Sequence, residues 1–155
     1  MKRLSLILLT LLSLNLASAQ NDWFGLRTGY PLGVTIHYGI GNGLPNGFDM
    51  RISANLRVRN NNLVDFGLGI DGMNTVYRDR PLEFYVGGGP ALDFGGGGIL
   101  IDVHGLAGGE FRLYDAGIPR LGIFGEVSLG AGLGIGRDSI IPSAGVGFGF
   151  NWHLR

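Results

Sequence analysis

The sequence predicts an all-β protein in which eight antiparallel strands run up and down and close into one barrel. Three observations predict this fold class. Apolar and polar residues alternate with a period of two from residue 23 onward. Clusters of Gly, Pro, Asn and Asp divide that region into eight segments of strand length. No stretch of helical length there repeats its apolar residues every 3.6 positions.

The chain begins with a segment that precedes the barrel. Residues 1–19 have a basic start, an apolar run from Leu4 to Leu16 and the small-residue sequence Ala17-Ser18-Ala19. This order is that of a cleaved signal peptide, and the run is too short to span about 30 Å of hydrocarbon. Residues 20–155 then form a single barrel domain. The chain has no cysteine, which excludes disulfides, thiol catalysis and cysteine metal ligands.

Turn residues set the expected strand limits. The predicted strands are 23–30, 32–40, 48–58, 63–72, 82–93, 99–113, 121–134 and 143–154. The residues predicted to form the turns are Tyr30-Pro31, Asn46-Gly47, Asn60-Asn61-Asn62, Asp71-Gly72, the glycine run 95–98, Asp115-Ala116-Gly117 and Arg137-Asp138.

The two faces of each predicted strand differ sharply. In the last strand Val146, Phe148, Phe150 and Trp152 share one face, and glycines occupy most of the other. An eight-stranded barrel has little room inside, so the glycine-rich polar face belongs in the lumen and the apolar face outside. The polar face carries eight acids: Asp49, Asp65, Asp71, Glu83, Asp93, Asp102, Glu110 and Glu126. It also carries six arginines: Arg27, Arg51, Arg57, Arg59, Arg112 and Arg155.

A charge network inside the barrel follows from this composition. The only lysine is Lys2, so every cation after the leader is an arginine, which suits charges paired in fixed geometry. The network is expected to comprise Arg27, Asp49, Arg51, Arg57, Asp65, Asp102, Glu110, Arg112 and Glu126.

Aromatic residues of the apolar face gather near the two rims, as in barrels that span a lipid bilayer. One belt comprises Phe24, Tyr38, Phe48, Phe84, Phe111 and Trp152, and the other comprises Tyr30, Phe66 and Phe94.

With its leader, eight strands, polar lumen and aromatic last strand, the chain resembles the small eight-stranded outer-membrane β-barrel proteins of Gram-negative-type bacteria. The resemblance implies export to the outer membrane, with membrane lipid as the surrounding partner. It also implies recognition by the outer-membrane insertion machinery through the spacing Phe148-x-Phe150-x-Trp152-x-Leu154. If both termini are periplasmic, the longer connections, Gly41–Gly47 and Met73–Pro81, are periplasmic as well.

The motifs that could carry chemistry favour neither an enzyme nor a cofactor. Glycine clusters such as Gly87-Gly88-Gly89 open no helix, and a phosphate loop would need a lysine. We expect His37, His104 and His153 to pair with lumen carboxylates rather than to bind a metal. No nucleophile turn is present, and a net charge near zero gives no footprint for nucleic acid.

The sequence therefore predicts an integral outer-membrane barrel, a monomer, with a structural role in the envelope and a mostly closed, salt-bridged lumen. One alternative is a barrel that binds a small polar ligand or allows minor permeation through its lumen. Another is a soluble, secreted, lipocalin-like barrel with an apolar cavity for a hydrophobic ligand.

Overall fold

The computed structural model describes residues 21–41, 47–58, 64–95, 98–135 and 140–154. Several predictions concern residues outside these ranges: the signal peptide 1–19, Asn46, Asn60-Asn61-Asn62, residues 96–97, Arg137-Asp138, and the lumen arginines Arg59 and Arg155.

No helix in the described ranges is long and apolar enough to cross a membrane.

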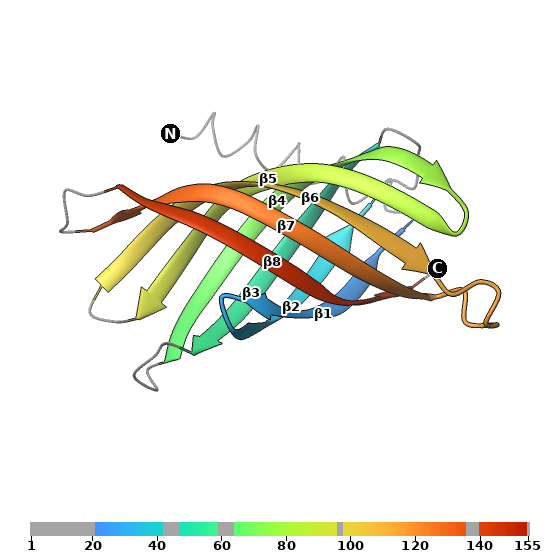
Figure 1. Ribbon diagram of the computed structural model, residues 1–155, viewed down its shortest axis with the longest axis horizontal. Coiled ribbons are helices and arrows are strands. Elements are labelled where there is room, and N and C mark those ends of the chain that lie inside the picture. The colour runs from blue at the N-terminus through green and yellow to red at the C-terminus, as the bar shows by residue number, and fades with distance from the viewer. Residues whose placement is uncertain (1–20, 42–46, 59–63, 96–97, 136–139, 155) are drawn as a thin grey trace, which may run out of the picture.

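Eight strands form a closed barrel in sequence order, as predicted (Figure 1). The strands are β1 (Trp23–Tyr30), β2 (Gly33–Ile40), β3 (Phe48–Val58), β4 (Val64–Asp79), β5 (Leu82–Gly95), β6 (Gly98–Arg112), β7 (Leu121–Gly134) and β8 (Ile140–His153). Each strand pairs antiparallel with the next, and β8 closes the sheet on β1. Because the sheet closes on itself, every strand is paired on both sides for at least part of its length.

The fourth strand is longer than predicted, and the loop expected at Met73–Pro81 is wrong. β4 continues through Asp71-Gly72 to Asp79, and a two-residue turn, Arg80-Pro81, leads into β5. Asp71 and Gly72 are common turn residues, but here the Asp71 carboxylate is needed inside the barrel beside Arg51. The in-and-out alternation continues beyond them, and a β-bulge between Thr75 and Tyr77 shifts the register against β5.

The turn predicted at Asp115-Ala116-Gly117 is present between β6 and β7. Gly117 has a φ of 75°, a left-handed conformation that glycine adopts without steric cost. Its amide N donates a hydrogen bond to the Tyr114 carbonyl oxygen at 3.0 Å. This turn lies at the same end of the barrel as the C-terminal end of β8 (Figure 1).

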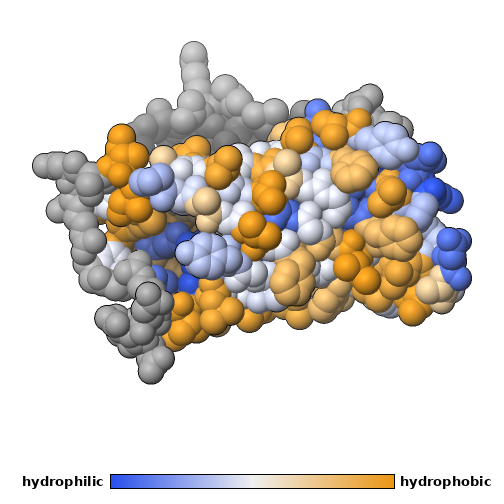
Figure 2. Space-filling view, viewed as in Figure 1, coloured by the Kyte–Doolittle hydropathy of each residue, from blue (hydrophilic) through white to orange (hydrophobic). Residues whose placement is uncertain are grey.

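The apolar face of every strand points outward. Large exposed apolar side chains occur on all eight strands, and Figure 2 shows them spread over the wall of the barrel. The lumen instead contains most of the buried polar and charged side chains. A soluble lipocalin-like barrel with an apolar cavity requires the opposite orientation, so this geometry contradicts that alternative.

Glycines on the lumen side make room for large neighbours. A Cβ on Gly39 would lie 2.1 Å from ring carbons of Trp23, and a Cβ on Gly122 would lie 2.2 Å from Oε1 of Glu110. Both distances are far inside van der Waals contact, so these positions admit no side chain without displacing a neighbour. The lumen is therefore filled by a few large polar and aromatic groups set against glycine.

The barrel wall is lower at the β1–β2 hairpin than elsewhere. These two strands have eight residues each, and the last pair between β1 and β8 is Tyr30 with Val146. Residues 140–145 of β8 continue beyond this hairpin while still pairing with β7, as Figure 1 shows. A hydrophilic hollow is visible near this end of the barrel in Figure 2.

Candidate functional site in the lumen

The centre of the lumen is occupied by Arg51 of β3. Its Nε and Nη2 donate to Oδ2 of Asp71 on β4 at 3.1 and 2.9 Å, and its Nη1 donates to Oε1 of Glu126 on β7. Only 4% of the Arg51 side chain is exposed, with 4% of Asp71 and 2% of Glu126. Guanidinium suits this position because its donors fit two carboxylates in fixed geometry.

Glu126 joins Arg51 to two further side chains. Its Oε2 accepts a hydrogen bond from Nη1 of Arg27 at 2.8 Å, and its Oε1 also accepts one from the Tyr85 hydroxyl at 2.8 Å. Four strands thus meet at one carboxylate and its partners, because β1, β3 and β5 each supply a donor to β7. A buried carboxylate with this many partners is well satisfied.

A second cluster surrounds Glu110 of β6, nearer the end of the barrel where β1 begins and β8 ends. Its Oε1 contacts Nε2 of His153 at 2.6 Å, and Nε of Arg112 donates to the same oxygen at 3.4 Å. The side-chain amide of Asn151 donates to Oε2 of Glu110, and Asn151 Oδ1 lies 2.7 Å from Nε2 of His37. This cluster links β2, β6 and β8 across the lumen.

The third cluster lies toward the opposite end. Nη1 of Arg57 donates to Oδ2 of Asp93 at 3.1 Å, and 35% of the Arg57 side chain is exposed. His104 lies between two carboxylates, with Nε2 3.0 Å from Asp71 and Nδ1 3.2 Å from Asp102. The Ser143 hydroxyl donates to Oδ2 of Asp102 at 2.8 Å.

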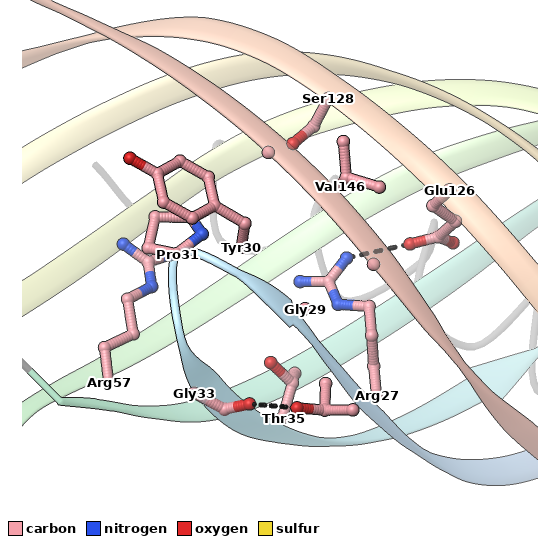
Figure 3. A pocket seen from close by; sticks show the side chains of 13 residues that line it. Arg27, Gly29, Tyr30, Pro31, Gly33, Thr35, Arg57, Glu126, Ser128 and Val146 are labelled. Carbon is pink, nitrogen blue, oxygen red and sulfur yellow. Dashed lines mark hydrogen bonds and ion pairs between the residues drawn. The ribbon is translucent and has the colours of Figure 1, made fainter.

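The central ion pairs separate cavities at the two ends of the lumen. The cavity at the end where β1 begins and β8 ends has a volume of about 20 Å³ and is bounded by Arg51, Tyr85 and Glu110. At the other end, a cavity of about 70 Å³ lies beside the β1–β2 hairpin, lined by Arg27, Arg57 and Glu126 among others (Figure 3).

A cavity of about 100 Å³ adjoins it and shares several lining residues, among them Arg27, Pro31 and Arg57. We call this larger cavity the upper vestibule. Its further polar lining comprises Ser53, Asn55, Asp71, Asp93, Asp102, His104, Ser128 and Ser143.

All nine residues of the expected charge network lie on the lumen side. Some of the carboxylates that pair with its arginines, however, were not part of that expected network. The ion pairs include Asp71 and Asp93, which strand parity placed on the polar face but which were not assigned to the network. His37 contacts Asn151 rather than a carboxylate, which corrects the expected pairing of that histidine. Asp49 and Asp65 are buried in the lumen, and other residues carry the ion pairs described above.

Several lumen partners had no signal in the sequence strong enough to single them out. Tyr85, Asn151 and the Arg78–Glu83 ion pair (2.7 Å) belong to this group. Parity placed Tyr85 on the lumen side, but only the register between β5 and β7 brings its hydroxyl to Glu126. Arg78 was missed because the segment that contains it was expected to be a loop.

The aromatic residues expected to form belts all lie on the outer face, toward the ends of their strands. At the end where β1 begins and β8 ends, Phe24 pairs with Tyr38 and Trp152 on neighbouring strands. At the other end Phe66 stacks on Phe94 with ring centroids 6.4 Å apart. Tyr77, 5.8 Å from Phe84, adds to the first group. The other tryptophan, Trp23, lies in the lumen against His153.

The described residues hold no group of three His, Cys, Asp or Glu side chains arranged for a metal ion. The histidines of the described residues, His37, His104 and His153, all lie on the lumen side. The described serines, Ser53, Ser128 and Ser143, lie there as well. The interactions that these side chains make in the lumen are hydrogen bonds and ion pairs.

An outward apolar face, a polar lumen and full closure define the class of the transmembrane β-barrels. A comparison with solved structures finds the same class. The chain is similar to Neisserial surface protein A (NspA), with a TM-score of 0.57, 10% identity, and 85% of this chain and 92% of that chain covered. It is also similar to the N-terminal β-barrel domain of Pseudomonas aeruginosa OprF, with a TM-score of 0.55, 14% identity, and coverage of 86% and 96%.

The outer membrane enzyme PagL also matches, with a TM-score of 0.47, 8% identity, and coverage of 86% and 98%. No protein-family model and no curated protein matches the sequence. The chain has the fold of the small eight-stranded outer-membrane β-barrels, and at these identities the likeness concerns the fold alone.

Proposed function

We propose that the protein is an integral outer-membrane β-barrel with a structural role in the envelope and a lumen closed by its own ion pairs. The observation that carries the proposal is the pairing of Arg51 with Asp71 and Glu126 across the middle of a barrel whose outer face is apolar.

The apolar outer face supports a membrane location. Water-soluble monomers rarely expose contiguous apolar patches larger than a few hundred Å². Here exposed Ile, Leu, Val and Phe side chains follow one another along every strand. A closed barrel also satisfies its backbone hydrogen bonds within the sheet, which is the requirement for a strand in hydrocarbon. Membrane lipid is therefore the partner that this surface fits.

The ion pairs support a closed lumen and a structural role. An ion moving along the axis would have to displace Arg51 from two carboxylates, and removing one partner of a buried pair costs about 3–5 kcal/mol. The cavities on either side of this layer have volumes of about 20 Å³ at one end and of about 70 and 100 Å³ at the other. In the described lumen the Ser143 hydroxyl donates to Asp102, and both ring nitrogens of His104 contact carboxylates rather than that hydroxyl. The described residues also hold no group of three side chains arranged for a metal ion, and we propose no enzymatic activity and no cofactor.

The membrane claim is tested by cell fractionation. We expect the mature protein in the outer-membrane fraction, extractable only with detergent, and unboiled samples to migrate differently from boiled ones on a denaturing gel. Recovery as a soluble periplasmic protein would contradict the proposal.

The closed lumen is tested separately, by conductance in planar bilayers. The wild-type barrel is expected to give no steady ion current, and Arg51→Ala with Glu126→Ala is expected to give one. A steady current through the wild-type barrel would contradict closure while leaving the membrane claim intact.

A further inference from the structure

We propose that the cavity beside the β1–β2 hairpin binds the phosphate group of a membrane lipid, a proposal that rests on the membrane location proposed above. The lipid reaches the cavity from the side, through a gap in the barrel wall. A break in strand pairing forms the gap, apolar side chains surround it, and two arginines with unused donors lie behind it.

The wall has its gap beside β8. Pairing between β1 and β8 ends at Tyr30 and Val146, and residues 140–145 of β8 pair only with β7 among the described strands. Gly145 and Val146, at the edge of this break, line the cavity together with Pro31 of the hairpin. Figure 2 views the barrel from the side, and hydrophilic residues are visible there in a hollow of the wall near this end. The cavity is therefore open toward the side of the barrel.

The rim of the gap is apolar. Tyr30 and Leu32 of the turn are exposed, with Pro31 between them, and so are Ile140 and Ile141 of β8. Turns that face water are commonly built from Gly, Asn, Asp or Ser, so an apolar turn suits contact with acyl chains. Tyr30 also belongs to the aromatic belt at this end, and such belts lie at the level of the lipid head groups. A head group at this level lies beside the gap.

Arg27 and Arg57 present unused donors to the cavity. Each donates through Nη1 alone, and their Nε and Nη2 atoms make no hydrogen bond to a described residue. The two side chains are 27% and 35% exposed, and neither has a fully buried nitrogen that lacks a partner. The unused donors therefore face open space, and both side chains border the cavity beside the turn (Figure 3).

The charge around the cavity favours an anion. Its charged lining consists of Arg27, Arg57 and Glu126. Glu126 is already held by Arg51 and the Tyr85 hydroxyl as well as by Arg27. Further carboxylates border the upper vestibule instead, where each contacts an arginine or a histidine: Asp71, Asp93 and Asp102. The lining of the smaller cavity therefore carries a net positive charge.

A phosphate group fits this cavity in size and in acceptors. The volume is about 70 Å³. At roughly 10–15 Å³ for each water molecule, it has room for about five atoms the size of an oxygen, enough for a phosphate group. A carboxylate is satisfied by one guanidinium, whereas the oxygens of a phosphate can accept from two that lie on different strands. The hydroxyls of Thr35 and Ser128 add donors to the wall.

The experiment is a titration of the ¹⁵N-labelled protein, folded in micelles of a neutral maltoside detergent, with dihexanoylphosphatidylglycerol and observation by NMR. Dihexanoylglycerol, which lacks the phosphate, and inorganic phosphate, which lacks the acyl chains, serve as matched probes. With the phospholipid we expect saturable shifts of the Nε–H signals of Arg27 and Arg57 and of the Gly145 amide. Inorganic phosphate should bind about tenfold more weakly or worse, because it makes no contact with the apolar rim. Dihexanoylglycerol should give no saturable shift at these positions.

Two arginine variants accompany the titration. Arg27→Gln and Arg57→Gln each remove one guanidinium, and each is expected to weaken phospholipid binding about tenfold or more, since hydrogen bonds to a charged group are lost. Arg120→Gln removes an exposed arginine at the opposite end of the barrel, next to the start of β7, and is expected to leave the affinity unchanged.

The outcomes are distinct. Saturable phospholipid binding that weakens in either arginine variant supports the site. If neither variant folds, shifts at Arg27 and Arg57 in the wild type support it and shifts confined to other residues overturn it. The site is also overturned by the absence of a saturable shift, by equal shifts with dihexanoylglycerol, or by equal affinity in the wild type and both variants. Equal affinity for inorganic phosphate would overturn it as well, since the occupant would then be an adventitious ion only.

Cell fractionation tests the membrane location separately. A protein found in the outer membrane that fails this titration loses the lipid site alone, and the micelle-folded sample makes the titration independent of where the protein resides in the cell.

Discussion

Replacing Arg51 with methionine should destabilise the barrel far more than the same change at Arg57. Both arginines lie on β3 and both contact carboxylates, but 4% of the Arg51 side chain is exposed against 35% for Arg57. Removing Arg51 leaves Asp71 and Glu126 buried without their main cation, a change that costs about 3–5 kcal/mol. Although the Asp93 side chain is only 10% exposed, water reaches Arg57 and screens this pair, so its loss should cost nearer to what exposed ion pairs contribute, about 0–1 kcal/mol.

The structure refines the size of the effect. Glu126 keeps Arg27 and Tyr85 in the Arg51→Met variant, and Asp71 keeps His104, so the loss should lie near the lower limit, about 3 kcal/mol. With a urea dependence of about 1–3 kcal/mol per molar, the midpoint falls by about 1–3 M. The corresponding fall for Arg57→Met is at most about 1 M.

The assay is urea unfolding of the protein refolded in detergent micelles, followed by tryptophan fluorescence. A matched triple variant, Arg51→Met with Asp71→Asn and Glu126→Gln, removes the charges together and should recover most of the lost stability, because no uncompensated charge remains. Equal midpoints for the Arg51 and Arg57 variants would refute the reasoning, since they would mean that water reaches both arginines alike.

Two further substitution pairs test the two faces of the barrel. Val146→Arg, in the middle of β8 on the outer face, should cost about 2–4 kcal/mol in lipid vesicles, and Leu154→Arg near the end about 0–1 kcal/mol, measured by denaturant titration. Identical costs would mean that this face does not meet a bilayer. Gly39→Ala, whose Cβ would meet the Trp23 ring, should lower stability by about 1–3 kcal/mol. Gly105→Ala, on the outer face with space around it, should be nearly neutral, and the reverse order would contradict the filled lumen.

Strand number and order followed from a period-two pattern repeated eight times. Which face lies outside followed from the glycines and balanced charges of the other face and from the aromatic belts. Phe48 to Val58 illustrates this, since its predicted bounds and its alternation are those observed. Other strand ends differ by about three residues or fewer, apart from β4.

The end of β4 could not be predicted because local and tertiary preferences conflict there. Asp71-Gly72 has the composition of a turn, and nothing local indicates that Arg51, twenty residues earlier, holds the Asp71 side chain in the lumen. The bulge after Thr75 then interrupts the parity that would have revealed the rest of the strand.

Partner choice in the lumen could not be predicted for a related reason. Parity assigns a residue to the lumen but gives neither its height along the axis nor its neighbour across the barrel. Arg57 meets Asp93 of β5, although Asp65 of the adjacent strand is its register partner. Such contacts depend on strand tilt and stagger, which a single sequence does not specify.

The two tryptophans of the chain test most directly which face of the sheet meets lipid. Trp152 lies on the outer face of β8, and Trp23 lies in the lumen with 6% of its surface exposed. The variants Trp23→Phe and Trp152→Phe each leave one tryptophan, and each can be refolded into vesicles of phospholipid brominated near the headgroup end of the acyl chain. We expect strong quenching of Trp152 fluorescence and little quenching of Trp23 fluorescence. Quenching of Trp23 as strong as that of Trp152, or none of either, would contradict this orientation of the sheet.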